Sequence, residues 1–337
     1  MTPTRCIKLA LLSAAIACMG FAGEAGAQTI ELKLSHFIPP NHTFHKCAVG
    51  YADLLAKESN GRLKVTIYPN GQLVGPPTRQ FDAARNGIVD MSFVLHTVTP
   101  GRYPITELAQ LAFTWPKAGS GSMTTSRRLS ELGPKYLVEE HAGLHILWMA
   151  VANPIVIYSK IPLRKLDDFK GVKIRYSGVP NRNLLASLGA VPLLIQPPES
   201  QDALAKGIID GATFPHEAAL SLDLGVVAKH ATEPGLATAP FAFVMNPAKY
   251  NSLPPDLKAL IDRTSGPAAA QQFGKMWEDA EKHGRDEEIK QGVQIHTLSD
   301  ADIADLKRRV APQIEEAVVT LEKAGKPARK FLEDYTK

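Results

Sequence analysis

The sequence predicts a two-lobed α/β protein with a cleft between the lobes, and three observations support this prediction. Strand and helix patterns alternate along the first part of the chain, one short segment is repeated, and long charged helical patterns follow in the C-terminal part. The 337 residues are 45% hydrophobic and 21% charged, a globular composition with enough length for about two domains. We therefore expect mixed sheets in two lobes, with helices packed across them.

The order of elements near the start is the first observation. Residues 30–35 alternate apolar and polar side chains, which is typical of a half-buried strand. Thr43 is a suitable helix cap, and the run 88–95 is apolar and β-branched, as in a strand buried on both faces. The expected order is strand, helix, strand, helix and strand, over 30–35, 43–60, 63–68, 78–86 and 88–95.

A repeated segment is the second observation. Residues 81–90 and 201–210 share aspartate, alanine, glycine, isoleucine and aspartate at the same positions. In each copy a glycine, Gly87 or Gly207, ends a helix, because glycine accepts the left-handed conformation of a helix stop. We expect both lobes to contain this unit. Each copy also follows a strand pattern, at 63–68 and 172–176.

The C-terminal part provides the third observation. Pro254–Pro255 occupies a favoured first-turn position of a helix, and a long charged helix continues past Trp277. Ser299 with Asp302 forms a capping pattern for a further long helix. The expected boundaries are 28–152 with 240–279 for the first lobe, and 153–239 with 280–337 for the second.

Residues 1–27 have the pattern of a secretory signal peptide. Arg5 and Lys8 precede an apolar run over 9–21, and three small residues then supply a cleavage site. The run is too short to act as a membrane-spanning helix. We therefore expect export to a periplasm. A lipid anchor at Cys18 stays open as an alternative.

The charges and motifs exclude several functions. The formal net charge is +4, and the basic residues are scattered, so the sequence indicates no nucleic-acid partner. The chain lacks a Gly-x-Ser-x-Gly elbow, a Walker loop and a Gly-x-Gly-x-x-Gly phosphate loop. His216–Glu217 lacks the second histidine of a zincin, because Leu220 occupies its position. We expect no cofactor and no enzyme activity.

Three segments resemble the solute-binding proteins of tripartite ATP-independent periplasmic (TRAP) transporters, in particular the DctP-like family. Residues 60–73 resemble the family segment GRLKVxxYPxGQLG, residues 166–175 resemble DLKGLKIR, and residues 203–212 resemble ALQTGVVDGAE. The likeness extends from about Ile30 to the C-terminus. It implies a two-lobed periplasmic binding protein fold, type II-like, that captures an organic carboxylate and delivers it to a TRAP membrane permease, its only link to the membrane.

The resemblance assigns the main ligand contact to Arg175. In the family, the arginine at this strand end faces the cleft and forms a two-pronged salt bridge with the ligand carboxylate. A planar guanidinium offers two parallel N–H donors that match both carboxylate oxygens, and a closed cleft strengthens the pair by lowering the local dielectric. Lysine would supply the charge without this geometry.

Departures from the family pattern indicate the class of ligand. The family usually has Glu-Asn-Pro where this chain has Thr213, Phe214 and Pro215, and no second arginine follows Trp148 before Arg164. These changes remove partners for a second carboxylate and favour an aromatic monocarboxylic acid. The expected ligand-binding residues are Arg175, Phe214, Asn153, Phe93, His36 and His42.

The loop after the first strand suggests an alternative function. His36, His42, His45 and Cys47 include the donor types that zinc and copper prefer, so a metal-binding protein or a metal-dependent periplasmic enzyme stays open. Packing of Cys47 as a small hydrophobic side chain, with His36 or His42 at the distal end of an organic ligand, is the interpretation that we prefer.

Overall fold

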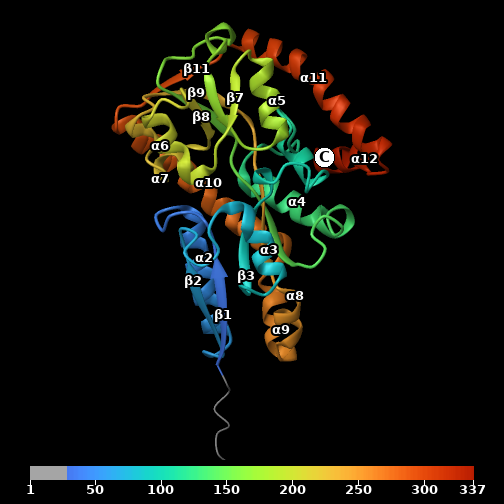
Figure 1. The fold of residues 1–337 in the computed structure, drawn as a ribbon. Helices are drawn as coiled ribbons and strands as arrows, with labels where there is room; N and C mark the ends of the chain where they lie inside the picture. Colours follow the sequence, from blue (N-terminus) through green and yellow to red (C-terminus); the bar gives the residue numbers. More distant parts are fainter. Residues whose placement is uncertain (1–28) are drawn as a thin grey trace, which may run out of the picture.

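The computed structural model describes residues 29–337 and has two lobes, which lie one below the other in Figure 1. The signal peptide expected at 1–27, with Cys6 and Cys18, lies outside the described residues. We call the lobe with the five-stranded sheet the lower lobe and the lobe with the six-stranded sheet the upper lobe. The two-lobed α/β fold expected from the sequence is therefore confirmed.

The lower lobe has the strand order β2-β1-β3-β10-β4, in which β2, β1 and β3 are parallel and β10 is antiparallel to β3 and β4. Apolar clusters cover both faces of this sheet: Phe243 of β10 belongs to one cluster, and its neighbours Ala242 and Val244 belong to the other. The strands are β1 (Ile30–Ser35), β2 (Leu63–Tyr68), β3 (Met91–Leu95), β4 (His145–Val151) and β10 (Pro240–Met245).

The upper lobe has the strand order β11-β9-β5-β8-β6-β7. Here β7, β6 and β8 are parallel, and β5 is antiparallel to β8 and β9. The strands are β5 (Ile155–Ser159), β6 (Lys173–Tyr176), β7 (Val191–Leu194), β8 (Gly211–Phe214), β9 (His230–Ala237) and β11 (Gln294–Thr297).

The repeated segment has the same structure in both lobes. A 3₁₀ turn and a short helix, Pro77–Arg79 with α3 (Gln80–Arg85), lead into β3, and Pro197–Glu199 with α6 (Ser200–Ala205) leads into β8. The strand order β2-β1-β3 therefore corresponds to β7-β6-β8. The strand directly before the second copy is β7, which the sequence did not predict, and the predicted strand at 172–176 corresponds to β1 rather than to β2.

The aspartate at the end of each copy, Asp90 or Asp210, makes the same contact in both lobes. The Asp90 carboxylate accepts a hydrogen bond from the backbone of Lys33 at 2.7 Å, and that of Asp210 accepts one from the backbone of Lys173 at 3.1 Å. Each aspartate thus bonds the backbone of the neighbouring parallel strand, at Lys33 within β1 and at Lys173, the first residue of β6. In the upper lobe this contact fixes the strand that carries Arg175.

The other helices cover the sheets and connect the lobes. The chain caps α2 at His42, whose side chain accepts from Phe44 N, rather than at the expected Thr43; the Ser299–Asp302 capping box is present as expected. These helices are α2 (Thr43–Glu58), α4 (Ser122–Tyr136), α5 (Val179–Ser187), α7 (His216–Ser221), α8 (Pro247–Ser252), α9 (Pro255–Arg263), α10 (Gly266–Lys290), α11 (Asp300–Lys323) and α12 (Ala328–Tyr335).

Helix α10 contacts α4 and β4 of the lower lobe and α7 of the upper lobe, so it crosses the boundary between them (Figure 1). Helix α12 also does not follow the expected division of the chain into two lobes. Its Phe331 and Tyr335 pack in the same cluster as Leu129 and Met149 of the lower lobe, although the expected boundaries place 280–337 with the upper lobe. The C-terminus therefore ties the long α11 back to the lower lobe.

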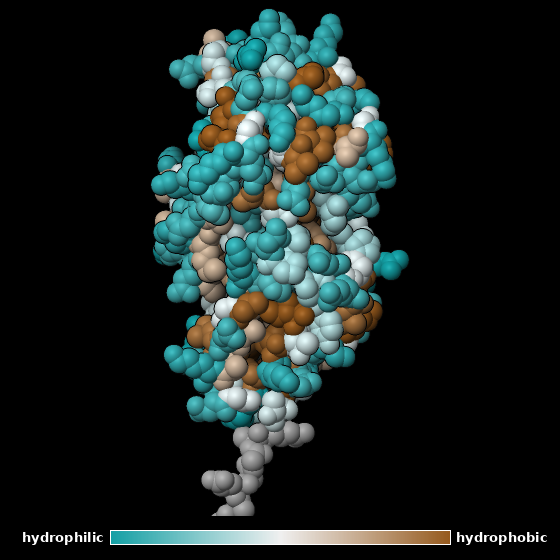
Figure 2. All heavy atoms as spheres, turned by 90° about the vertical axis from the view of Figure 1, so that its left-hand side faces the viewer, coloured by the Kyte–Doolittle hydropathy of each residue, from teal (hydrophilic) through white to brown (hydrophobic). Residues whose placement is uncertain are grey.

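The surface is mostly hydrophilic on the face that carries α2 and β2, with apolar side chains in separate patches (Figure 2). None of the helices within 29–337 has the length and apolar character needed to cross a bilayer.

Candidate functional site

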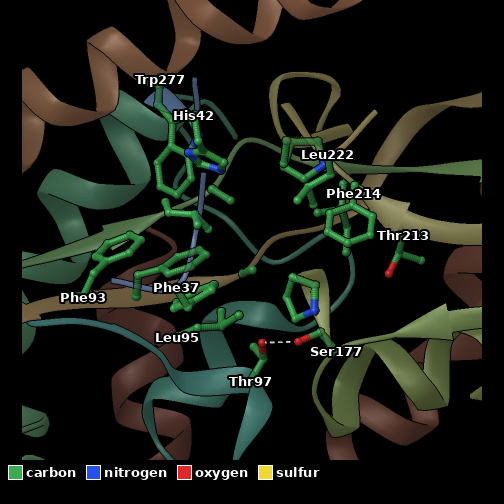
Figure 3. A pocket seen from close by; sticks show the side chains of 18 of the residues that line it. Phe37, His42, Phe93, Leu95, Thr97, Ser177, Thr213, Phe214, Leu222 and Trp277 are labelled. Carbon is green, nitrogen blue, oxygen red and sulfur yellow. Dashed lines mark hydrogen bonds between the residues drawn. The ribbon is translucent and has the colours of Figure 1, made fainter. Parts of the chain in front are cut away.

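A cavity lies between the two lobes (Figure 3), and its empty volume is about 600 Å³ when the open solvent at its mouth is included. Phe37, Phe93 and Trp277 form one side, and Phe214 with Leu222 forms the other. Most of the lining is apolar. Arg175 contributes its charged guanidinium to the lining, and the imidazole of His42 lies there as well. The space suits a small organic molecule.

Arg175 is the central charged group of this cavity. The residue is only 3% exposed, and its guanidinium donates to Ile195 O at 3.0 Å and to Thr213 O at 2.9 Å. Within 29–337 the structure contains no acidic partner for it, and burial lowers its pKa to about 9, so it stays charged at neutral pH. A buried cation without a protein anion is the arrangement that an anionic ligand completes.

The fold positions Arg175 through the strands beside it. Arg175 lies opposite Ala212 of β8 and Leu193 of β7, and its guanidinium reaches the carbonyl of Thr213 near the end of β8. There its central carbon lies 4.3 Å from the centre of the Phe214 ring, a cation–π contact. Thr213 adds a hydrogen bond from its hydroxyl to Arg175 O at 3.1 Å.

Phe93 lies on β3 of the lower lobe, at the position that corresponds to Thr213 in the repeated segment, one residue before the counterpart of Phe214. Its side chain is fully buried, stacks on Phe241 with ring centres 4.8 Å apart and also stacks on Phe44. Phe93 lines the cavity from the side opposite Phe214 (Figure 3). The structure therefore brings Arg175, Phe214 and Phe93 to one cavity.

His42 also lines the cavity, at the start of α2. Its Nδ1 accepts from Phe44 N at 3.1 Å and lies 3.2 Å from Glu217 Oε1, and its ring meets Trp277 edge to face. Burial lowers the pKa of His42, although the charge of Glu217 opposes this shift. The ring is therefore neutral at pH 7 and adds no second cation to the site.

Two expected ligand-binding residues do not line the cavity. His36 is fully buried, and its Nε2 pairs with His45 Nδ1 at 3.0 Å. Asn153 accepts from Ser122 N at 3.1 Å and donates to Trp277 O at 3.0 Å, so its amide joins the start of α4 to α10. Asn153 therefore bonds the backbone of Trp277, whose side chain lines the cavity, whereas His36 packs against Phe44.

The loop that offered the metal-binding alternative does not bring its four donor side chains to one site. His36 and His45 bond to each other, His42 caps α2, and Cys47 packs against the lower core, where burial raises its pKa to about 12. Across residues 29–337 no group of three or more histidine, cysteine or acidic side chains is arranged to hold a metal ion. The geometry therefore does not support the metal-dependent alternative.

Sequence reasoning missed most of the lining, including the polar or large side chains of Trp277, Thr97, Gln110 and Ser177. Ser177 had a signal, because it follows Arg175 by two positions at a strand end and so points to the same side. The others come from segments distant in the chain, and no local pattern marks them.

A buried ionic cluster lies behind α7. His216 Nε2 is 3.0 Å from Glu233 Oε1, and its Nδ1 is 3.7 Å from Glu288 Oε2. Burial alone would lower the pKa of His216, but hydrogen bonds to these carboxylates outweigh burial and raise it to about 9. Glu281 accepts from the backbone N–H groups of His216 and Glu217 at 2.8 and 2.9 Å, and burial raises its pKa to about 7.

We expect this cluster to make stability depend on pH. Because the folded pKa of His216 lies above its ordinary 6.5, its stabilisation is complete below pH 6.5 and is lost as the pH rises through about 9, by up to about 3 kcal/mol. Unfolding in urea at pH 7, 8 and 9 measures this loss. The Glu281 transition lies lower, between its ordinary 4.5 and about 7, so it overlaps the His216 transition only near pH 7 and contributes little to the change between pH 8 and 9.

The variant His216→Gln should remove most of the decline in unfolding free energy above pH 7. The exposed His283, which lies on α10 outside the cluster, serves as the matched control, and His283→Gln should keep the decline. An unchanged slope in His216→Gln would contradict the assignment.

Comparison with known proteins identifies the family. Residues 34–320 match the DctP family, described as bacterial extracellular solute-binding protein, family 7. The chain belongs to this family. The C4-dicarboxylate-binding periplasmic protein DctP of Rhodobacter capsulatus is 27% identical over 282 residues, which cover 83% of this chain and 84% of that protein.

Two solved structures of TRAP solute-binding proteins are also similar, each with 29% sequence identity. One, from Rhodoferax ferrireducens T118 with copurified benzoate, has a TM-score of 0.86 and matches 91% of this chain and 96% of its own. The other, from a marine metagenome and specific for aromatic acid ligands, contains 3-hydroxybenzoate and has a TM-score of 0.87 over 91% and 97% of the two chains. The resemblance to TRAP solute-binding proteins is confirmed: this is a periplasmic-type TRAP solute-binding protein.

Proposed function

We propose that this protein captures an aromatic monocarboxylic acid in the periplasm, by a salt bridge to Arg175 and closure of the lobes, and delivers it to a TRAP membrane permease. The observation that carries the proposal is a buried guanidinium without a protein anion among residues 29–337, set in a cavity whose walls are mostly apolar and aromatic. The relatives suggest two ligand classes, because one is named for C4-dicarboxylates and another contains benzoate. The lining favours the second class.

The number of charges in the cavity supports one carboxylate. Arg175 is the sole guanidinium of the lining, no lysine side chain lines it within the described residues, and His42 is neutral. A second carboxylate would therefore be buried without a partner, at a cost of several kcal/mol. A four-carbon diacid has no apolar body whose burial could offset this cost.

The apolar walls support an aromatic body. Phe214 lies under the guanidinium, and Phe37, Phe93 and Trp277 face it across the cavity (Figure 3). A ligand ring placed between these walls would remove about 150 Å² from water, worth roughly 3 to 4 kcal/mol before ordering costs. The Arg175 salt bridge and the ring burial would then act at opposite ends of one small molecule.

The test compares the binding of two acids. The protein is first unfolded and refolded, because this step removes any copurified ligand. Calorimetric titration with benzoate and with succinate should give a dissociation constant ~100-fold lower for benzoate, because only succinate leaves a carboxylate unpaired. Tight binding of succinate with none of benzoate would contradict the ligand class and leave the family assignment intact.

Phe214 offers a second measurement of ligand class. In Phe214→Asn, the amide restores the residue that relatives usually have, and the variant should bind benzoate ~10-fold more weakly and bind polar acids better than the parent does. Phe214→Leu is the matched control, because it keeps an apolar wall and should not gain affinity for polar acids. If Phe214→Asn binds benzoate like the parent, the ring does not lie against Phe214.

A further inference from the structure

His42 lies at the start of α2, where its ring lines the cavity beside Trp277 (Figure 3). The two ring nitrogens have different surroundings. Nδ1 accepts from Phe44 N at 3.1 Å and so caps the helix. Nε2 bonds to no protein group within residues 29–337, and it is not among the unpartnered atoms that are sealed inside the protein. Nε2 therefore keeps accessible surface, and the cavity is the space that His42 lines.

The helix cap determines which ring nitrogen carries the proton. A nitrogen that accepts from a backbone N–H uses its lone pair, so in the neutral ring of His42 the hydrogen is on Nε2. Glu217 Oε1 lies 3.2 Å from Nδ1, but this oxygen has a donor of its own, because it accepts from Thr43 N at 2.7 Å. Two successive N–H groups of α2 thus bond to the two acceptors separately. His42 presents an N–H donor to the cavity.

The other nitrogen donors among the side chains of the lining are largely in use. Trp277 Nε1 and Gln110 Nε2 each donate to a protein oxygen. The Nε and Nη1 groups of Arg175 donate to carbonyls, which leaves Nη2 and the second hydrogen of Nη1 for the ligand carboxylate. Across the described part of the chain, Arg175 and His42 are therefore the lining residues whose nitrogens still offer a hydrogen to a ligand.

The surroundings of Nε2 indicate what kind of ligand group it binds. Trp277 lies beside the imidazole, Leu222 faces it across the cavity in Figure 3, and neither side chain has a hydrogen-bond acceptor. Glu217, the carboxylate next to Nδ1, is not part of the lining. A ligand hydroxyl at this place would leave its own proton without a side-chain acceptor, which costs free energy. A carbonyl or ether oxygen accepts the hydrogen bond and brings no proton.

The two free donors lie on opposite sides of the cavity. The Arg175 guanidinium lies 4.3 Å from the ring centre of Phe214 in the upper lobe, whereas His42 meets Trp277 on the side formed by the lower lobe and α10. A ligand ring between these walls would separate the group bound by Arg175 from the group bound by His42. The second group therefore belongs at the end of the ligand remote from the carboxylate.

We propose that His42 selects ligands with a carbonyl or ether oxygen at the end remote from the carboxylate, by donating to that oxygen from Nε2. This proposal rests on the proposed function and narrows it to acyl- or alkoxy-substituted aromatic monocarboxylates. Arg175 belongs to β6 of the upper lobe and His42 to the lower lobe, so the two donors hold one molecule from both lobes. The bond to His42 forms only when the lobes are together around the ligand.

Matched pairs of acids with nearly the same shape test the proposal on refolded, ligand-free protein. One pair is para-methoxybenzoate with para-ethylbenzoate, and the other is para-acetylbenzoate with para-isopropylbenzoate; the meta isomers of both pairs are titrated as well. Each pair differs in one acceptor oxygen and hardly in volume. In calorimetry the parent protein should bind the oxygen-containing acid of at least one pair ~10-fold more tightly, because the apolar partner leaves a buried N–H without an acceptor.

The variant His42→Asn separates ligand selection from helix capping. Asparagine is a favoured N-cap residue and keeps an acceptor for Phe44 N, but its shorter side chain has no group at the place of Nε2. The variant should unfold at nearly the same temperature as the parent and show less than ~3-fold preference within each pair, because the selecting hydrogen bond is lost. His45→Asn is the matched control: His45 lies on the same helix, bonds to His36 and does not line the cavity, so the preference should remain.

NMR of the imidazole nitrogens provides a readout that does not depend on affinity. His42 should show an unprotonated Nδ1 and a protonated Nε2, and para-methoxybenzoate should shift the Nε2 signal more than para-ethylbenzoate does. The loss of these signals in His42→Asn assigns them. A proton on Nδ1 in place of Nε2 would overturn the proposal.

The titrations have further outcomes that contradict the proposal. Equal weakening of both acids of a pair in His42→Asn would show that the residue only supports the start of α2, and it would overturn the proposal. A parent protein that binds benzoate but prefers no oxygen-containing acid would overturn it as well, with the proposed function intact. A parent that binds neither benzoate nor any of the substituted acids would refute both.

Discussion

The variant Arg175→Lys should keep the fold and bind its carboxylate ligand at least ~30-fold more weakly than the parent, a loss of about 2 kcal/mol. The guanidinium already donates to Ile195 O and Thr213 O, and it can do so while its remaining N–H groups face a carboxylate. An ammonium group has no fixed fork, so lysine cannot hold both carbonyls and present two parallel donors. Calorimetry with benzoate measures the loss.

A second substitution separates charge from geometry. Arg175→Met removes the buried cation, so it should abolish measurable binding while leaving the thermal midpoint of the ligand-free protein unchanged or higher, because burial disfavours the charge that it removes. Arg182→Lys is the control: Arg182 is exposed and bonds only to Asn183 among the described residues, so its loss should not affect binding. Parent-like affinity in Arg175→Lys would remove Arg175 as the anchor.

Glu217→Gln should weaken ligand binding by ~10- to 100-fold without touching the carboxylate site, because Glu217 connects the lobes. From α7 of the upper lobe, its Oε1 accepts from Thr43 N at 2.7 Å, at the start of α2, and its Oε2 accepts from Trp277 Nε1 at 2.9 Å, on α10. An amide supplies one acceptor only, so its NH₂ group would face one of these donors. A buried donor without a partner costs about 1–3 kcal/mol.

The lost hydrogen bond should destabilise the conformation in which the lobes are together, because separation of the lobes would break the bond between Glu217 and Thr43 in any case. Affinity is reduced when the binding-competent conformation is less populated. Calorimetry measures the affinity, and small-angle X-ray scattering should show that ligand reduces the radius of gyration less than in the parent. Glu278→Gln is the matched control: Glu278 accepts from Met123 N at 2.8 Å, on the lower-lobe side of α10, and should not alter affinity. Parent-like affinity in Glu217→Gln would exclude this link between the lobes.

The sequence alone determined the features that depend on neighbouring residues. The alternation of apolar residues marked β1 and β2, the capping box at Ser299 marked the start of α11, and the repeated segment marked the same turn and helix in both lobes. These features are local, since each arises from contacts within a few positions along the chain. The motif at the end of β6 also placed Arg175 at a strand end, where it lines the cavity.

Only the tertiary structure decided which side chains share the cavity. The lining joins Thr97 and Gln110 of one lobe to Ser177 of the other, and Trp277 reaches the cavity from α10. His36 and Asn153 looked equally suitable in the sequence, yet local packing directs His36 toward His45 and Asn153 toward Ser122 and α10. Strand periodicity predicts which residues share a face of a strand. The segment that covers this face comes from a distant part of the chain, and packing of the whole chain determines which segment it is.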